Sequence, residues 1–190
     1  MKRSLGCVAG ALLLLWSAAG WADEYSDTVA LFKNAGASSK FFETAYGYAV
    51  FPTIGKGGFV VGGAHGTGRV YRQGVYVGDA SMTQVSVGLL AGGQAYSQII
   101  FFQDERSFKE FTSGNFEFGA DAQAVAITAA AGAGTGTTGT SAGASGGQKD
   151  ATTVGSKWYK GMAVFTIVKG GAMAEAAVGG QKFKFTPKST

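Results

Sequence analysis

The stretch FPTIGKGGFVVGGAHGTGRVY, residues 51–71, combines many glycines with aromatic, β-branched and a few basic residues. Glycine inside a β-strand gives up side-chain packing and costs entropy, so it usually marks a bulge, a bend or a close approach of two backbones. So many glycines in one run predict a tightly curved β structure. Lys56 lies at a glycine-lined bend within it.

Further β-type runs surround this stretch, and glycines separate several of them. Gly74 lies between two of the runs and indicates a hairpin. Pro187 suits a strand end, since proline cannot donate to a ladder. The predicted strands are residues 48–51, 59–61, 69–71, 75–77, 82–90, 94–102, 116–129, 163–168 and 182–185.

Residues 82–90 show the alternation of a strand that has two different faces. Val85, Val87 and Leu89 lie on one face. Ser86 and Gly88 lie on the other.

Helices are predicted at three places. Residues 23–34 carry an apolar stripe and an acidic first turn, which suits the positive end of a helix. Ser38 or Ser39 could cap a second short helix with Phe41 and Phe42, and Asp104 a third with Phe108 and Phe111. We interpret the first stripe as packing on a sheet. A membrane-seeking helix is the alternative, but its polar face would normally be rich in Lys and Arg.

Residues 1–22 resemble a cleaved signal peptide. Lys2 and Arg3 precede a short apolar segment, and Gly20 and Ala22 provide the small residues before the expected cleavage after Ala22. An uncleaved anchor is the alternative. The only cysteine, Cys7, lies inside this segment and away from the cleavage site, so the processed chain would have neither a disulfide nor a lipidated cysteine.

Residues 23–190 are predicted to form one domain. Residues 130–153 consist mainly of Gly, Ala, Ser and Thr and are interpreted as a mobile loop, because they offer little apolar surface to offset ordering. The pattern favours the α+β class. We expect a strongly curved antiparallel β-sheet or partly closed β-barrel, with two N-terminal helices and a short internal helix.

Catalytic and metal-binding chemistry has little support in this chain. His65 is the only histidine, so the usual His-rich or Cys/His zinc sites are excluded, and no nucleophile-elbow pattern accompanies it. Gly55-Lys56-Gly57 lacks the spacing of a phosphate-binding loop. We therefore expect no enzyme activity, no cofactor and no metal. Removal of Lys2 and Arg3 lowers the formal charge from +4 to +2, which argues against nucleic acid as a partner.

Two groups of basic residues near aromatic ones favour contact with lipid headgroups, because cations can pair with phosphate while aromatic rings occupy the polar–apolar boundary. The alternative is a solvated basic face, with Trp158 in the core. The candidate residues are Lys56, Arg69, Arg72, Lys157, Trp158 and Lys160.

The order of several motifs resembles the SYLF domain family. The motifs are Ala49-Val50-Phe51-Pro52, the run from Gly55 to Gly63, Gly66-Thr67-Gly68, Ser86-Val87-Gly88, Gln94-Ala95-Tyr96-Ser97, the helix with Phe108 and Phe111, and Lys160-Gly161. The resemblance covers roughly residues 38–185. It implies binding of membrane phospholipids, phosphoinositides in eukaryotic members, without known catalysis. Some eukaryotic members also bind actin.

The chain departs from the family pattern where Gly78-Asp79-Ala80-Ser81 replaces a Trp/Tyr-rich segment, and in its acidic first helix. The expected function is that of an exported, periplasmic protein that binds anionic phospholipids reversibly at the membrane surface. The alternative is a cell-envelope structural or protein-interaction module. A hydrolase centred on His65 and a pore made from the glycine-rich strands are weaker alternatives, since the strands lack the alternating apolar pattern of outer-membrane barrels.

Overall fold

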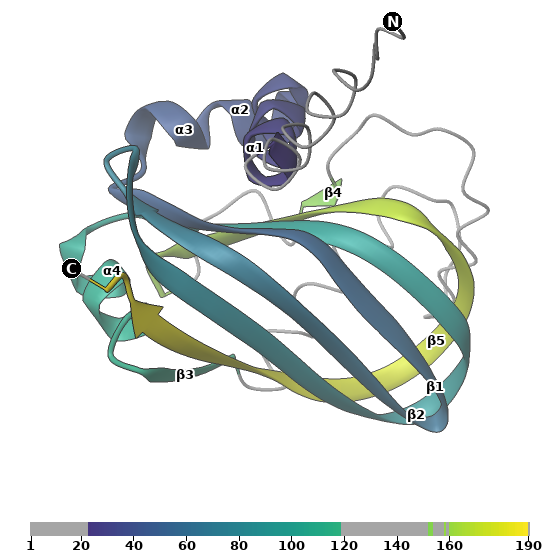
Figure 1. Ribbon diagram of the computed structural model, residues 1–190. Helices are drawn as coiled ribbons and strands as arrows, with labels where there is room; N and C mark the ends of the chain where they lie inside the picture. Colours follow the sequence, from purple (N-terminus) through teal and green to yellow (C-terminus); the bar gives the residue numbers. More distant parts are fainter. Residues whose placement is uncertain (1–22, 119–151, 154–157, 159, 190) are drawn as a thin grey trace, which may run out of the picture.

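The computed structural model describes residues 23–118, 152–153, 158 and 160–189. The chain order is α1 (Asp23–Asn34), α2 (Gly36–Ser39), α3 (Phe41–Thr44), β1 (Gly47–Arg72), β2 (Val75–Phe102), α4 (Glu105–Phe111), β3 (Asn115–Phe118), β4 (Thr152–Thr153) and β5 (Met162–Pro187). Three long strands thus dominate the fold (Figure 1). The expected signal peptide and residues 119–151 of the predicted strand and loop lie outside the described residues.

The strands form one antiparallel sheet in the order β1-β2-β5-β3, and β4 also pairs with β5. This confirms a strongly curved antiparallel sheet in an α+β fold. The ladder path ends at β1 and at β3, and among the described strands no ladder joins these two. The partly closed barrel is therefore not supported. β4 places Thr152 and Thr153 beside Thr166 and Phe165, so the end of the predicted loop belongs to the sheet.

The short predicted strands are parts of much longer ones. Residues 48–51, 59–61 and 69–71 all belong to β1, and 163–168 and 182–185 both belong to β5. The glycines between them do not end the strands. Bulges instead interrupt the β1–β2 ladder, and Pro52, which cannot donate a hydrogen bond, lies in the one between Phe51 and Ile54.

The hairpin predicted at Gly74 is confirmed. Arg72 pairs with Val75, and the two residues between them, Gln73 and Gly74, have φ angles of 49° and 80°. Positive φ at both turn positions matches the twist of a two-residue hairpin, which is why glycine is favoured there. The Gln73 N–H donates to the carbonyl oxygen of Tyr46, so this turn lies beside the start of β1.

β1 folds back on itself about Val60. A Cβ added to Gly68 would lie 2.6 Å from the carbonyl oxygen of Val50, and one added to Gly66 would lie 2.9 Å from that of Thr53. Side chains at these positions would hold the two halves of the strand apart. Their absence lets the halves approach closely, as the glycine pattern predicted.

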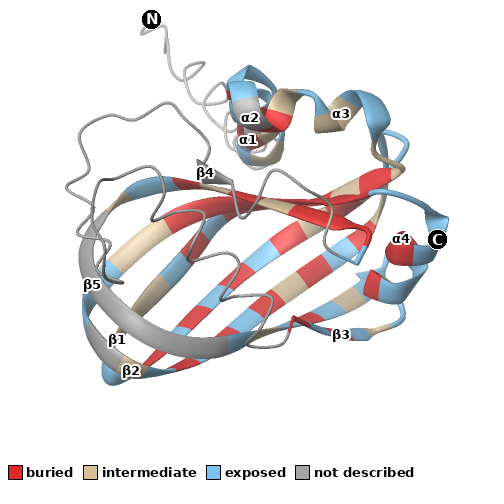
Figure 2. Cartoon of the chain, turned by 180° about the vertical axis from the view of Figure 1, so that it is seen from behind, coloured by how far each residue is buried: buried red, intermediate tan, exposed pale blue. Residues whose placement is uncertain are grey.

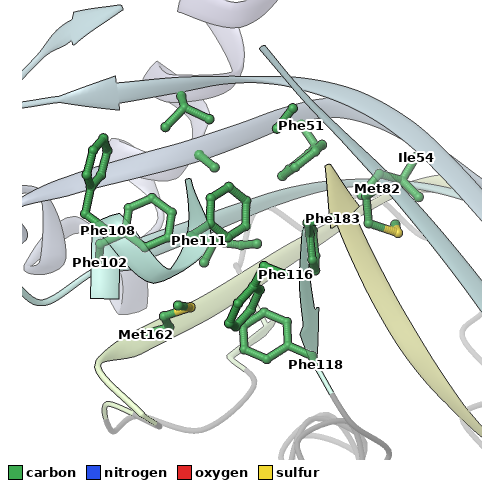
Figure 3. Close-up of a cluster of buried hydrophobic side chains, with 14 of the residues drawn as sticks. Phe51, Ile54, Met82, Phe102, Phe108, Phe111, Phe116, Phe118, Met162 and Phe183 are labelled. Carbon is green, nitrogen blue, oxygen red and sulfur yellow. The ribbon is translucent and has the colours of Figure 1, made fainter. Parts of the chain in front are cut away.

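Two apolar clusters cover the two faces of the sheet at the end away from the bend in β1. Ile100 and Phe102 belong to the cluster enclosed with α4 and β3, where Phe111 and Phe183 also pack (Figure 3). Ile99 and Phe101 belong to the cluster under α1–α3. Consecutive apolar residues in this part of β2 are therefore explained by burial on both faces. Figure 1 shows α1–α3 over one side of the sheet and α4 near β3.

The helix predictions are largely confirmed. α1 has the predicted bounds, and α4 begins after Asp104, whose carboxylate accepts a hydrogen bond from the Ser107 N–H at 2.8 Å. The second predicted helix is instead two four-residue helices, α2 and α3. The serine cap was wrong, because Ser38 and Ser39 lie inside α2 and the Ser38 hydroxyl donates to the Phe32 carbonyl oxygen.

Replacing Gly68 with alanine should destabilise the fold by about 1–3 kcal/mol, because the new methyl group would collide with Val50 and the Phe51 ring. Urea unfolding of G68A and the unmodified chain measures the difference. G55A is the matched control in the same strand, since nothing lies within 4 Å of its added Cβ. Equal loss of stability in both variants would contradict the close approach of the β1 halves.

Acid should weaken the cap of α4. The backbone N–H of Ser107, followed by its side chain, holds the pKa of Asp104 below its ordinary value. Since the folded-state pKa is depressed, the contribution is present above the unfolded pKa of about 3.9 and is lost as pH falls through the folded value. The urea midpoint of D104N should therefore fall less on acidification than that of the unmodified chain. D27N on α1 is the control, and identical acid profiles for D104N and the unmodified chain would refute the prediction.

Candidate functional site

The structure places Lys56 and Arg69 on opposite faces of β1. Lys56 is two residues after the core residue Ile54 and is half-buried, so its side chain starts from the inward face. Arg69 alternates with the core residues Gly68 and Val70 and starts from the outward face. Their ladder partners are Gln94 and Asp79, so different parts of the hairpin carry them. The structure therefore does not bring these two cations together on one face of β1.

The Arg69 guanidinium is engaged inside the protein. It lies 4.2 Å from the centre of the Tyr25 ring of α1 and 5.3 Å from that of Tyr76. Desolvation, followed by the Asp79 side chain, raises the pKa of Tyr76. Stacking of Arg69 on Tyr25 connects α1 to the sheet, which is a structural role that the predicted lipid contact did not anticipate.

The remaining predicted site residues are also apart. Arg72 is exposed next to the hairpin turn, and Lys160 is exposed before β5. The centres of the Trp158 and Phe41 rings are 5.0 Å apart, and Trp158 packs against the cluster under α1–α3. This contact agrees with the alternative in which Trp158 is a packing residue. Lys157 lies outside the described residues.

The face of β2 that carries valines points outward near the bend. Val85 and Val87 are 59% and 61% exposed, whereas Gln84 and Ser86 are buried. The buried pair is hydrogen-bonded, with Gln84 Nε2 donating to Ser86 Oγ at 2.9 Å and Gln181 Nε2 donating to Gln84 Oε1 at 3.1 Å. The alternation was recognised in the sequence, but burial is reversed from what apolarity alone would suggest.

The valines of β2 lie beside the bend of β1. Val87 pairs with Val61, and Val85 pairs with Gly63. Phe59, Val60 and Val61 are themselves exposed, and Phe59 reaches 79%. We call these five residues, Phe59, Val60, Val61, Val85 and Val87, the apolar tip. Figure 2 shows exposed residues where β1 and β2 curve, at the end of the sheet away from α4. Exposed apolar residues that gather in this way mark an interaction surface.

Sequence reasoning missed the apolar tip because it concentrated on basic residues. The signal available in the sequence was three consecutive apolar residues, 59–61, between two pairs of glycines. A bend flanked by glycines has little bulk around it to cover such side chains.

His65 lies on β1 opposite Thr83 of β2. It is exposed, and its Nδ1 lies 3.3 Å from the Thr83 hydroxyl oxygen. Within the described ranges, no group of three His, Cys, Asp or Glu side chains could hold a metal ion. A hollow of about 370 Å³ lies between Tyr25 of α1 and the sheet, and its lining includes both Asp79 and Lys184. This mixture of charges does not favour an anionic ligand.

The described residues thus combine one curved antiparallel sheet, two buried aromatic clusters and an exposed apolar tip. A model of the Ysc84 family, described as "Las17-binding protein actin regulator", matches residues 83–188, which is more than half of the chain. The chain therefore belongs to the Ysc84 (SYLF) domain family, as the resemblance indicated. The matched residues include β2 from Thr83 on, but the glycine-rich run of β1 precedes them. Neither the curated proteins nor the solved structures contain a match.

No helix among the described residues is long and apolar enough to cross a membrane.

Loss of the Arg69 contact should loosen α1. R69Q removes the cation stacked on Tyr25, and we expect a loss of about 1 kcal/mol in the free energy of unfolding. R72Q, which removes an exposed cation three residues further along β1, is the matched control and should change little. Urea unfolding measures both. If R72Q costs as much as R69Q, net charge and not stacking explains the loss.

Proposed function

We propose that this chain is an exported, non-catalytic protein that binds phospholipid membranes reversibly at their surface, with a preference for anionic lipid. The apolar tip carries the proposal, since a water-soluble domain rarely leaves several large apolar side chains together in solvent. Membership of the Ysc84 (SYLF) family supports it, because lipid binding is implied for that family. Export to the periplasm rests on the signal-like residues 1–22.

The charges around the apolar tip suit an anionic surface. Residues 80–103 contain no charged side chain, and residues 54–68 contain Lys56 and His65 but no carboxylate. Lysine can lay its apolar stem along a hydrophobic surface while its ammonium group reaches the polar boundary. Lys56 is three residues before Phe59, and its side chain starts from the inward face of β1, so its long apolar stem would have to carry the ammonium group to the boundary beside the bend. Because the Arg69 guanidinium stacks on Tyr25, we assign this role to Lys56.

A protein partner is the second candidate. The family description names binding of Las17 and regulation of actin, so at least some members act on proteins. In an exported chain the corresponding partner would be a component of the cell envelope, and the apolar tip or an edge of the sheet could receive it.

Co-sedimentation with vesicles tests the proposal. Protein purified as cells export and process it should pellet with vesicles of phosphatidylglycerol and phosphatidylcholine more than with phosphatidylcholine alone, and N-terminal sequencing should place its first residue at Asp23. Higher salt should weaken the preference, since charge attraction is screened over about 8–10 Å. Equal pelleting with both vesicle types would contradict anionic preference, and no pelleting would contradict membrane binding.

Lys56 should contribute more than Arg72 to the anionic preference. K56Q should weaken binding to anionic vesicles about fivefold, because a lysine near an anionic surface contributes about 1 kcal/mol. R72Q removes the same charge at the turn of the β1–β2 hairpin, away from the bend, and is the matched control. The same vesicle assay measures both variants. An equal loss in K56Q and R72Q would assign the effect to net charge.

A further inference from the structure

We propose that the apolar tip inserts into the hydrocarbon boundary of the bilayer, so that the sheet stands end-on with its bend in the membrane and its helices away from it. The inference rests on the proposed function and adds the residues and the orientation. In this arrangement, burial of apolar side chains in the bilayer contributes most of the binding free energy, and Lys56 adds a preference for anionic lipid.

The backbone at the bend presents its apolar side chains to solvent. In a regular strand, successive side chains point to opposite faces, so three consecutive residues cannot all face outward. Val60 has a φ angle of 66°, which is unusual for a β-branched residue, and the β1–β2 register shifts between Phe59 and Val61. Phe59, Val60 and Val61 are consequently 79%, 52% and 58% exposed. The chain adopts a costly backbone conformation here, and the outcome is three adjacent apolar side chains in water.

The ladders extend this surface onto β2. Val61 and Val87 are direct partners, and Val85 is on the same outward face as Val87. The tip is therefore a patch across two strands. It lies at the bend midway along the β1–β2 hairpin, whereas the Gln73–Gly74 turn is hydrogen-bonded to Tyr46 near the helices.

A bilayer fits this surface better than a second protein does. The tip is the outside of a bend, and a soft apolar medium accepts a protruding shape without a matching groove. The segments that form it carry one lysine, one histidine and no carboxylate, so few charges would have to leave water. The nearest carboxylate along the neighbouring strand is Glu175, whose ladder partner is Leu90 of β2.

Replacing Phe59 with a polar residue separates insertion from simple adsorption. F59S should lower the affinity for phosphatidylglycerol–phosphatidylcholine vesicles roughly tenfold or more, because burying phenylalanine contributes strongly to transfer out of water. V75S is the matched control: Val75 is 65% exposed on the same hairpin but next to its turn. V75S should bind within about twofold of the unmodified chain. Circular dichroism and urea unfolding establish that both variants are folded.

The depth to which the apolar tip enters the bilayer is measured with a tryptophan probe. F59W should shift its emission to the blue on vesicle addition and be quenched by lipids brominated on their acyl chains, whereas V75W should show neither change beyond the signal of the parent chain. If the unmodified chain pellets but F59S pellets equally, or F59W is not quenched, insertion is refuted and membrane binding stands. If the unmodified chain does not pellet at all, the proposed function fails as well. If F59S instead dissociates a dimer of the unmodified chain in sedimentation velocity and leaves vesicle binding unchanged, the tip is a contact between copies and the inference is overturned.

Discussion

The close approach of the two halves of β1 is the constraint on which the rest of the structure depends. Gly66 and Gly68 meet Thr53 and Val50 at distances that leave no room for a Cβ, so the strand can return along itself only where side chains are missing. The fold-back curves β2 and β5 with it, because the three long strands share continuous ladders. It also creates the bend at Val60, where the apolar tip is formed.

The curved sheet has two ends with different chemistry. At the helix end, both faces of β2 are covered, and consecutive residues such as Phe101 and Phe102 belong to separate cores. At the bend end, the inward face carries the hydrogen-bonded Gln84 and Ser86, and the outward face carries valines. Stability is therefore concentrated at the helix end by aromatic packing. The bend end keeps apolar side chains available for a partner, which in our proposal is the bilayer.

Much of the local structure could be predicted from local signals. Asp104 at a helix start, Gly74 at the hairpin turn and the acidic first turn of α1 act through their nearest neighbours in the chain. The strands predicted within 48–102 and 163–185 were correct in position but too short, because glycines were interpreted as breaks between strands. At Gly66 and Gly68 the glycines instead allow the two halves of β1 to approach closely. The candidate site was less predictable. Lys56 and Arg69 are near in sequence, yet strand alternation and the bulge at Val60 place them on opposite faces.

Residue types, spacing and motif order were enough to predict the α+β class, the curvature of the sheet, the Asp104 cap, the hairpin at Gly74 and the family. Only the tertiary structure decided which face of each strand is buried. Gln84 and Val85 alternate in polarity as in any strand with one buried face. The side toward which the sheet curves decides that Gln84 is buried and Val85 is exposed. Likewise, Tyr25 reaches Arg69 only because α1 packs on the sheet. Contacts between residues far apart in the chain depend on how the elements assemble, and no local pattern encodes them.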